Sequence, residues 1–170
     1  MPFELQPTLE GDLVCLRPLK SEDFEALHHA ASDPLIWEQH PQPDRHKVEV
    51  FRDGFFRTAL ESGGAFVILD NETDAIIGSS RFHDYKEAAS EIEIGWSFLA
   101  RGYWGGVYNG EVKSLMLRHA FQFVDNAVFV IGPENSRSRK AVEKVGGVLV
   151  GTRPDPERVV YRIQKSSGRF

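Results

Sequence analysis

Hydrophobic residues alternate with polar ones in several short segments of the chain, and they recur at helical spacing in others. The alternating or continuous apolar runs predict strands over residues 12–19, 65–69, 75–85, 91–99, 127–131, 148–151 and 158–163. Apolar positions three and four residues apart predict helices over residues 21–31, 44–62, 108–124 and 135–145. Strands that first pair as hairpins and then alternate with helices indicate a mixed α/β fold with a partly antiparallel sheet.

Local signals place the boundaries of these elements. Ser21 is expected to cap the first helix, and Pro34 to end the helical region because the residue before a proline avoids the α conformation. Residues 70–74 have the composition of a hairpin turn. Simple alternation along strand 91–99 separates two faces. One face carries Glu91, Glu93, Gly95 and Ser97, and the other carries Ile92, Ile94, Trp96 and Phe98.

Length and composition narrow the class of protein. With 170 residues and neither a linker nor an internal repeat, the chain is expected to form a single domain over residues 1–170. The formal net charge of −5 argues against a nucleic-acid partner and suits an amine-bearing one. The single cysteine, Cys15, excludes an internal disulfide, and the six histidines lack metal-ligand spacing, so no metal is expected.

The termini and the apolar runs indicate a location. The first residues show no basic region followed by an apolar core, so no secretory signal is visible. No apolar run approaches the ~20 residues that a membrane span needs. These observations predict a cytoplasmic protein with no membrane partner.

The segment 91–121 reads as strand, glycine-rich loop and helix. A helix start offers unpaired N–H groups and the positive end of its dipole, and glycines let backbone amides approach phosphate oxygens. The spacing of Gly102, Gly105 and Gly106 fits neither a P-loop nor a dinucleotide-binding fingerprint. A simple tight turn and a phosphate-binding loop therefore stay open. Residues 135–140, which supply a cap, two hydroxyls and three cations at the next helix start, favour the second reading.

Three motifs carry a resemblance to a known family. They are Glu93-Ile94-Gly95-Trp96; Tyr103-Trp104-Gly105-Gly106-Val107-Tyr108-Asn109 with Glu111; and Asn135-x-x-Ser138 leading to Glu143-Lys144-Val145-Gly146. The chain resembles the GNAT superfamily of acyl-CoA-dependent N-acetyltransferases, and within it the branch of ribosomal-protein N-alpha-acetyltransferases. The order of the predicted elements also matches, so the resemblance covers nearly the whole chain.

The resemblance implies a mostly antiparallel, splayed central sheet flanked by helices, with the pantetheine arm of acetyl-CoA in the gap. It implies a cofactor site on the strand after Glu93, on the loop and on the helix that follows Asn135. The residues so implicated are Trp96, Ser97, Phe98, Leu99, Arg101, Tyr103, Trp104, Gly105, Gly106, Val107, Tyr108, Asn109, Asn135, Ser138 and Arg139.

The family's chemistry is direct attack of an amine on the thioester. By resemblance, Glu93 is the base, a backbone amide near Phe98 is the oxyanion donor, and Ser138 is the acid. Many family members carry a tyrosine where this chain has Val142, which favours Ser138. Val107 stands where the family has a small residue, and it would be strained if the backbone there required a positive φ. A non-catalytic acyl-CoA-binding module is therefore the alternative function.

The acceptor stays open between a protein N-terminus, a polyamine, an aminoglycoside and an amino-acid amine. The resemblance places the acceptor cleft against the loop that holds Trp37, Glu38 and His40, and it makes a homodimer one option. Carboxylates at Glu38, Glu91 and Glu93 are expected to face the amine. The cations at Arg101 and in residues 137–140 are expected to face the phosphates.

Overall fold

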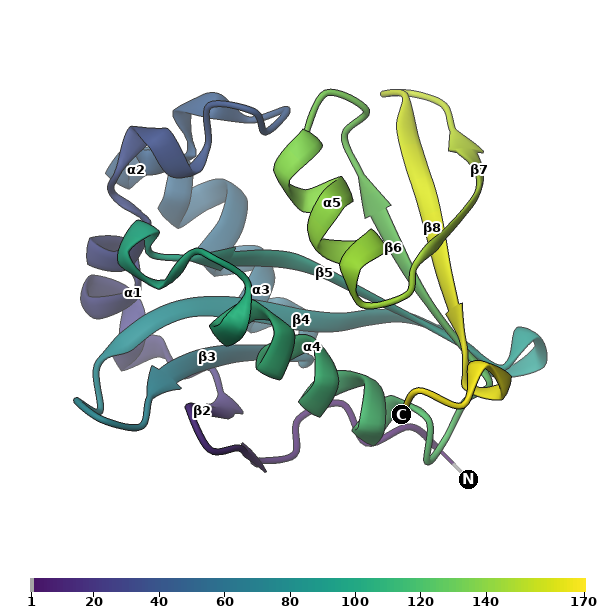
Figure 1. Ribbon diagram of the computed structural model, residues 1–170. Helices are drawn as coiled ribbons and strands as arrows, with labels where there is room; N and C mark the ends of the chain where they lie inside the picture. The colour runs from purple at the N-terminus through teal and green to yellow at the C-terminus, as the bar shows by residue number, and fades with distance from the viewer. Residues whose placement is uncertain (1) are drawn as a thin grey trace.

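The computed structural model describes residues 2–170, which form an open eight-stranded sheet (Figure 1). The strands are β1 (Leu9–Glu10), β2 (Val14–Pro18), β3 (Ala65–Asp70), β4 (Ile76–Lys86), β5 (Glu91–Leu99), β6 (Asn126–Ile131), β7 (Val148–Arg153) and β8 (Arg158–Gln164). Their order is β1-β2-β3-β4-β5-β6-β8-β7, and each neighbouring pair is antiparallel except β5 and β6. The mixed, mostly antiparallel α/β fold is confirmed. β1 was not predicted, because two residues are too few to show alternation.

The parallel pairing of β5 with β6 is short, and the two strands then separate. The ladder joins Glu91 to Asn126, Ile92 to Ala127 and Glu93 to Val128. Both strands continue past this ladder, β5 to Leu99 and β6 to Ile131, without further pairing to each other. The splayed central sheet is thereby confirmed, and Glu93 stands at the point of separation.

Five α-helices cover the sheet within the described residues. They are α1 (Phe24–Ala31), α2 (Val48–Phe51), α3 (Arg57–Ser62), α4 (Val107–Ala120) and α5 (Ser136–Lys144). Helices α1–α3 lie on one face, and α4 and α5 lie on the other (Figure 1). A π-helical segment, Arg52–Phe56, joins α2 to α3, so the predicted helix 44–62 is continuous only from Val48 and contains one widened turn.

The start of the first helix differs from the prediction. A 3₁₀ turn, Ser21–Asp23, precedes α1, and Ser21 makes no capping hydrogen bond to the backbone. Asp23 instead accepts the backbone N–H of Lys20 at 2.8 Å and pairs with Arg17 at 2.9 Å. The predicted cap at Ser21 is wrong, because a 3₁₀ turn begins at Ser21 and the Asp23 carboxylate binds Arg17 and the N–H of Lys20, ahead of the helix.

A bulge in β5 decides which core receives its side chains. Gly95 pairs with Arg81, and Phe98 pairs with Ser79, so one extra residue is inserted in β5 between these pairs. Trp96 at this bulge has a φ of 54°. An extra residue shifts the two-residue period, so side chains beyond it change face. The predicted common face of Ile92, Ile94, Trp96 and Phe98 is wrong: the two isoleucines pack toward α4, whereas Trp96 and Phe98 pack with α1–α3.

A glutamate on α4 ties that helix to the start of the sheet. The carboxylate of Glu111 accepts the backbone N–H groups of Asp12, Leu13 and Val14 at 2.9, 2.7 and 2.8 Å. A Cβ on Gly11 would lie 2.7 Å from the Glu111 carboxyl carbon, so a glycine is required at this close approach. Three charge-assisted hydrogen bonds across nearly 100 residues of sequence therefore fix α4 in place.

Replacing Glu111 is expected to destabilise the fold. Glu111→Ala leaves three backbone donors without their acceptor, so we expect the free energy of unfolding to fall by about 2–4 kcal/mol. Urea unfolding followed by circular dichroism measures this change. Glu25→Ala, at an exposed position of α1, is the control and should change the free energy by less than about 0.5 kcal/mol. Equal effects of the two substitutions would show that the Glu111 contacts add nothing.

Candidate active site at the separation of β5 and β6

Glu93 is a buried carboxylate with two partners from other strands. Its side chain is 9% exposed; Oε1 accepts a hydrogen bond from Nη1 of Arg153 at 3.2 Å, and Oε2 lies 3.0 Å from Nε2 of His83. The His83 contact has an ion-pair distance without the alignment of a hydrogen bond. His83 is the cross-strand neighbour of Glu93 on β4, and Arg153 ends β7. The carboxylate is therefore held in one position where the strands separate.

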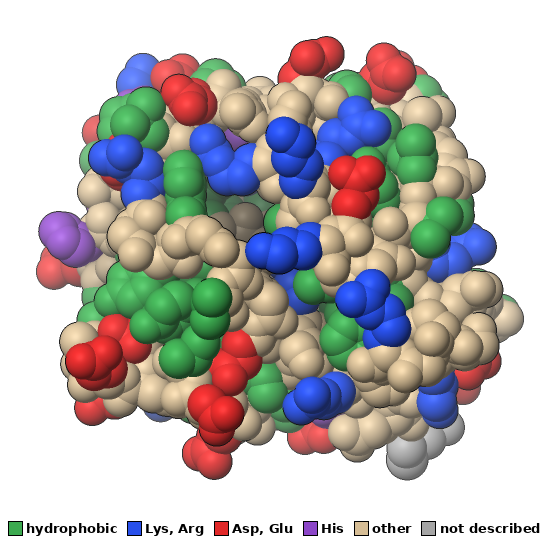
Figure 2. Space-filling model, viewed as in Figure 1, with side chains coloured by type: hydrophobic (Ala, Val, Ile, Leu, Met, Phe, Trp, Pro, Cys, Tyr) green, Lys and Arg blue, Asp and Glu red, His purple; other side chains and the backbone are tan. Residues whose placement is uncertain are grey.

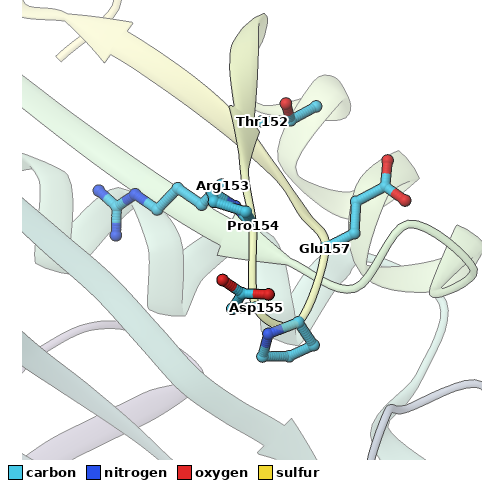
Figure 3. Close-up of a pocket in the computed structure, with 6 residues that line it drawn as sticks. Thr152, Arg153, Pro154, Asp155 and Glu157 are labelled. Atoms are coloured by element: carbon cyan, nitrogen blue, oxygen red, sulfur yellow. The ribbon is translucent and has the colours of Figure 1, made fainter.

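His83 and Arg153 were both missed as site residues. In the sequence, His83 is only one of six histidines without metal-ligand spacing. Its pairing with Glu93 depends on the β4–β5 register. Arg153 is joined to Glu93 only by the order β5-β6-β8-β7. A groove of about 620 Å³ lies at the β7–β8 turn, lined by Thr152, Arg153, Pro154, Asp155, Pro156 and Glu157. Figure 3 shows Arg153 extending away from Asp155 and Glu157, so this residue links the groove to Glu93.

The glycine-rich loop enters α4 through two left-handed residues. Gly105 has a φ of 119°, and Gly106, at the helix N-cap, has a φ of 99°. Val107 is the first residue of α4, has no positive φ, and is 69% exposed. The strain expected at Val107 is therefore absent, because the two glycines before it adopt the conformations that a branched residue resists.

A lysine from α5 reaches the start of α4. A Cβ built on Gly106 would lie only 2.3 Å from Nζ of Lys144, so the ammonium group sits directly against the N-cap. The start of a helix carries a partial positive charge, and a cation placed there is unfavourable unless an anion joins the two. This arrangement fits a phosphate group. Lys144 was not among the predicted binding residues, because it ends a different helix.

Most side chains of the loop are bound to the protein itself. The Tyr103 hydroxyl donates to Asp70 Oδ2 at 2.9 Å, Nε1 of Trp104 donates to the Leu99 carbonyl at 2.9 Å, and Arg101 pairs with Asp33. Tyr108 packs edge-on against Tyr103 with ring centroids 5.0 Å apart. The loop thus presents its backbone to a ligand, while its aromatic side chains anchor it.

The start of α5 is fixed from three directions. Asn135 is buried and caps the helix by accepting the Ser138 N–H at 3.3 Å. Arg139 donates to the Tyr161 hydroxyl at 3.0 Å and to the Pro133 carbonyl at 2.9 Å, so its guanidinium is held by the protein. Arg137 stacks over Trp104, with its Cζ 3.8 Å from the ring centroid. These contacts place Ser138, which is half-buried, on the helix turn that faces the glycine-rich loop.

The residues predicted to contact the acceptor have different environments. Trp37 is 2% exposed, and its Nε1 donates to the Ala31 carbonyl at 2.8 Å, so it forms part of the core beneath the loop. Glu38 is exposed and lies 3.6 Å from Arg137. Nε2 of His40 lies 3.3 Å from Nη1 of Arg45, and burial lowers the pKa of His40 to about 4. His40 is consequently uncharged at neutral pH.

A buried lysine lies between the separated strands. Nζ of Lys113, from α4, donates to Oγ of Ser97 on β5 at 3.3 Å and lies 5.7 Å from the ring centroid of Phe129 on β6. Lys113 is 4% exposed, and burial lowers its pKa to about 8. The burial of Lys113 follows from the packing of α4 on the sheet, which the sequence pattern does not show.

The sheet divides beside a buried glutamate, next to a glycine-rich helix start against which a lysine lies. This arrangement is typical of a transferase site for an extended, phosphorylated donor. The family model of the acetyltransferase (GNAT) domain matches residues 14–148. The chain therefore belongs to the GNAT family of acetyltransferases, whose acyl donor is acetyl-CoA.

Individual relatives agree with this assignment. The chain is 26% identical over 166 residues to the uncharacterized N-acetyltransferase p20 of Bacillus licheniformis, covering 92% of this chain and 90% of the relative. A probable GNAT-family acetyltransferase of Chromobacterium violaceum superposes with a TM-score of 0.86 at 20% identity, covering 99% and 91% of the two chains. RimJ of Mycobacterium smegmatis, solved in complex with CoA-disulfide, gives 0.74 at 20% identity, covering 95% and 88%. The last two likenesses show the fold alone, so the ribosomal-protein branch stays a prediction.

Residues 2–170 contain neither a metal-binding cluster nor a membrane-spanning helix. No group of three or more His, Cys, Asp or Glu side chains there is arranged to hold a metal ion. Within the same residues, no helix is long and apolar enough to cross a membrane.

Removing the buried charge of Lys113 is expected to stabilise the protein in a pH-dependent way. Because the pKa of Lys113 is lowered on folding, the folded state binds fewer protons than the unfolded state between pH 8 and about 10.4, and stability rises with pH across that range. Lys113→Met should therefore be more stable than the parent at pH 7, and this advantage should shrink by pH 10. Urea unfolding at both pH values measures it, with Lys140→Met as the exposed control. A pH-independent difference would show that folding does not lower the pKa of Lys113.

Proposed function

We propose that this acetyltransferase moves the acetyl group of acetyl-CoA to a primary amine by direct attack, with donor and acceptor bound together and Glu93 as the base. The observation that carries the proposal is the position of Glu93, buried at the separation of β5 and β6 and oriented by His83 and Arg153. A base must lie within reach of the amine, directly or through one water. Protein N-termini and small-molecule amines both belong to the proposed acceptor class.

The donor is bound along the edge of β5 and at the start of α4. The backbone of Trp96–Leu99, past the end of the β5–β6 ladder, pairs with the pantetheine arm. The N–H groups of Tyr103–Asn109 and the ammonium of Lys144 hold the pyrophosphate, where the two positive groups already converge. Asn135 orders the start of α5, so that Ser138 lies near the sulfur. The thioester supplies the activated acyl group.

Arg101 and Arg139 support the donor site less directly. The structure pairs Arg101 with Asp33, which anchors the beginning of the loop. Arg139 is bound to Tyr161 and Pro133, which fixes the segment before α5. We assign both residues to positioning the backbone rather than to neutralising phosphate charge.

The proton of the amine passes to Glu93. Its neighbour His83 is 26% exposed at the side chain, compared with 9% for Glu93, so the histidine offers a route for the proton toward solvent. The tetrahedral oxyanion is stabilised by a backbone amide near Phe98, beyond the bulge at Trp96, where β5 has no partner on its β6 side. Ser138 donates a proton to the leaving thiolate. Val142, in the place of the family's tyrosine, is buried in the core and has no proton to give.

A homodimer and a cytoplasmic location remain predictions for this protein. A homodimer would use the outer edge of the sheet at β7, where Val148, Leu149 and Val150 are exposed. A cytoplasmic location agrees with the proposed reaction between acetyl-CoA and an amine.

Glu93→Gln is the test of the base. It keeps the shape of the side chain and removes its ability to accept a proton, so we expect turnover at neutral pH to fall by about 10²- to 10⁴-fold. The acetyl-CoA dissociation constant should stay unchanged. Thiol release with an amine panel measures turnover, and calorimetry measures binding. Glu91→Gln is the matched control, since Glu91 lies two residues away on the same strand and pairs with Lys86 and Arg162. Parent-like turnover in Glu93→Gln would refute the assignment.

Lys144→Met tests the phosphate site. Loss of one cation beside the pyrophosphate is expected to weaken acetyl-CoA binding about tenfold, with a smaller dependence of affinity on salt concentration. The turnover number at saturating acetyl-CoA should be retained, because Lys144 does not contact the reacting atoms. Arg118→Met, at an exposed position near the other end of α4, is the control. An unchanged affinity would place the phosphates elsewhere.

A further inference from the structure

Two buried arginines lie on the face of the sheet that carries Glu93, and neither has a carboxylate partner in residues 2–170. Arg45, from the 3₁₀ turn Pro43–His46, is 7% exposed, and Arg81, from β4, is 4% exposed. Nη1 of Arg45 lies 3.3 Å from His40, and Nη2 of Arg81 donates to the Phe55 carbonyl at 3.3 Å. Nε of Arg81 is buried without any partner. Burying a charge without a counter-charge lowers the stability of the fold, so we expect these two groups to serve a function that offsets this cost.

Both guanidinium groups lie against the same two aromatic rings. The Cζ atoms of Arg81 and Arg45 lie 4.2 and 5.0 Å from the Trp96 ring centroid, and each lies 5.6 Å from that of Phe55. Cation–π attraction offsets part of the desolvation, but it adds no negative charge. Burial lowers the pKa of both arginines to about 10, and for Arg81 the charge of Arg45 contributes. Both groups are therefore charged at neutral pH, and they repel each other.

These cations lie next to the proposed base. Arg81 and His83 are two residues apart on β4, so their side chains share a face about 7 Å apart. His83 is paired across the sheet with Glu93, and Arg81 is paired with Gly95. Gly95 has no side chain to fill the space opposite Arg81. Figure 2 shows a hollow between the α2 region and α5 with Lys and Arg side chains around its rim.

The carboxylates expected to attract the amine are already neutralised. Glu38 pairs with Arg137, Glu91 lies within 3.9 Å of both Lys86 and Arg162, and Glu93 pairs with Arg153. Each of these three acids thus has a cationic partner, and Arg45 and Arg81 are two further cations without a carboxylate partner in residues 2–170.

We infer that the acceptor is a primary amine bearing a carboxylate close to its amino group, in the simplest case an amino acid, with the carboxylate bound by Arg81, the charge of Arg45 adding to the attraction, and the amine toward Glu93. The inference rests on the proposed function and narrows its substrate class. A planar guanidinium matches a carboxylate through two parallel hydrogen bonds, and binding such a group satisfies the unpartnered donors of Arg81. An amino acid with a hydrogen bond at each end can reach from Arg81 to the pair of His83 and Glu93, because residues two apart on a strand lie about 7 Å apart.

Other amines match this surface less well. A polyamine would place a second cation against the two arginines and be repelled. A protein N-terminus would present a neutral peptide carbonyl where the carboxylate is needed. A phosphate-bearing amine shares the anionic chemistry and differs in size and shape, so it forms a separate arm of the test.

The experiment compares amino acids with their own carboxamides, which differ only in the negative charge. Thiol release from acetyl-CoA is measured with both forms, with spermidine and with phosphoethanolamine, using the parent, Arg81→Met and Arg52→Met. We expect kcat/KM of the parent to be at least about tenfold higher for the acids than for the amides. Arg81→Met should bring the two within about threefold by lowering the value for the acids alone. Arg52→Met, an exposed arginine paired with Asp53, should behave as the parent.

Binding of the same ligands, measured by calorimetry and by thermal shift, separates this inference from the proposed function. Acid-selective binding by the parent without thiol release would support the anion site and overturn the acetyl transfer to these amines. Equal binding and turnover of acids and amides by the parent would overturn the inference while leaving acetyl transfer intact, as would a preference for spermidine. A preference for phosphoethanolamine over every amino acid would overturn the carboxylate. The acid-to-amide comparison in the parent needs no variant, so it decides the matter even if Arg81→Met does not fold.

Discussion

The short ladder between β5 and β6 is the constraint on which the rest of this structure depends. Three residue pairs join the strands, and beyond Glu93 and Val128 the two backbones separate. Backbone N–H and C=O groups that lose a strand partner need another one, and an edge that faces into the molecule is open only to a ligand. The bulge at Trp96 bends β5 just past this point and sends its side chains to the opposite face. The proposed donor groove thus begins where this ladder ends, and the bulge turns Trp96 toward α1–α3.

In this protein the local distribution of charged side chains differs from what the net charge suggests. The net charge of −5 does not describe the local charge, because cations lie beside the proposed donor and acceptor positions. Lys144 adds its charge to the start of α4, and Arg45 and Arg81 add theirs beside Trp96. Glu93 lies between these groups, and it is held by Arg153. A donor with phosphates and an acceptor with a carboxylate would both be drawn to these cations, and the amine would then lie toward Glu93.

Three buried cations near the site lower the stability of the fold without a ligand. Lys113, Arg45 and Arg81 each have a lowered pKa because burial disfavours the charged form. Elsewhere in the chain, charged side chains have partners. Asp23 pairs with Arg17, and the carboxylate of Glu111 accepts three backbone N–H groups. Local exceptions to an otherwise consistent structure are typical of functional sites, where a ligand supplies the missing partner.

The sequence by itself determined the elements of this protein and the family they form. Alternation and helical spacing depend on neighbours along the chain, so β5, α4 and α5 were predicted closely, and the motifs around Glu93, Gly105 and Asn135 carried the resemblance. The tertiary structure alone decided the partners of Glu93, the approach of Lys144 to Gly106 and the position of Arg45 and Arg81 over the same aromatic rings. Each of these contacts joins segments far apart in the chain, and each depends on strand order, on register or on one inserted residue in β5. A local pattern contains none of that information, because a shift of one residue reverses the face of every side chain that follows.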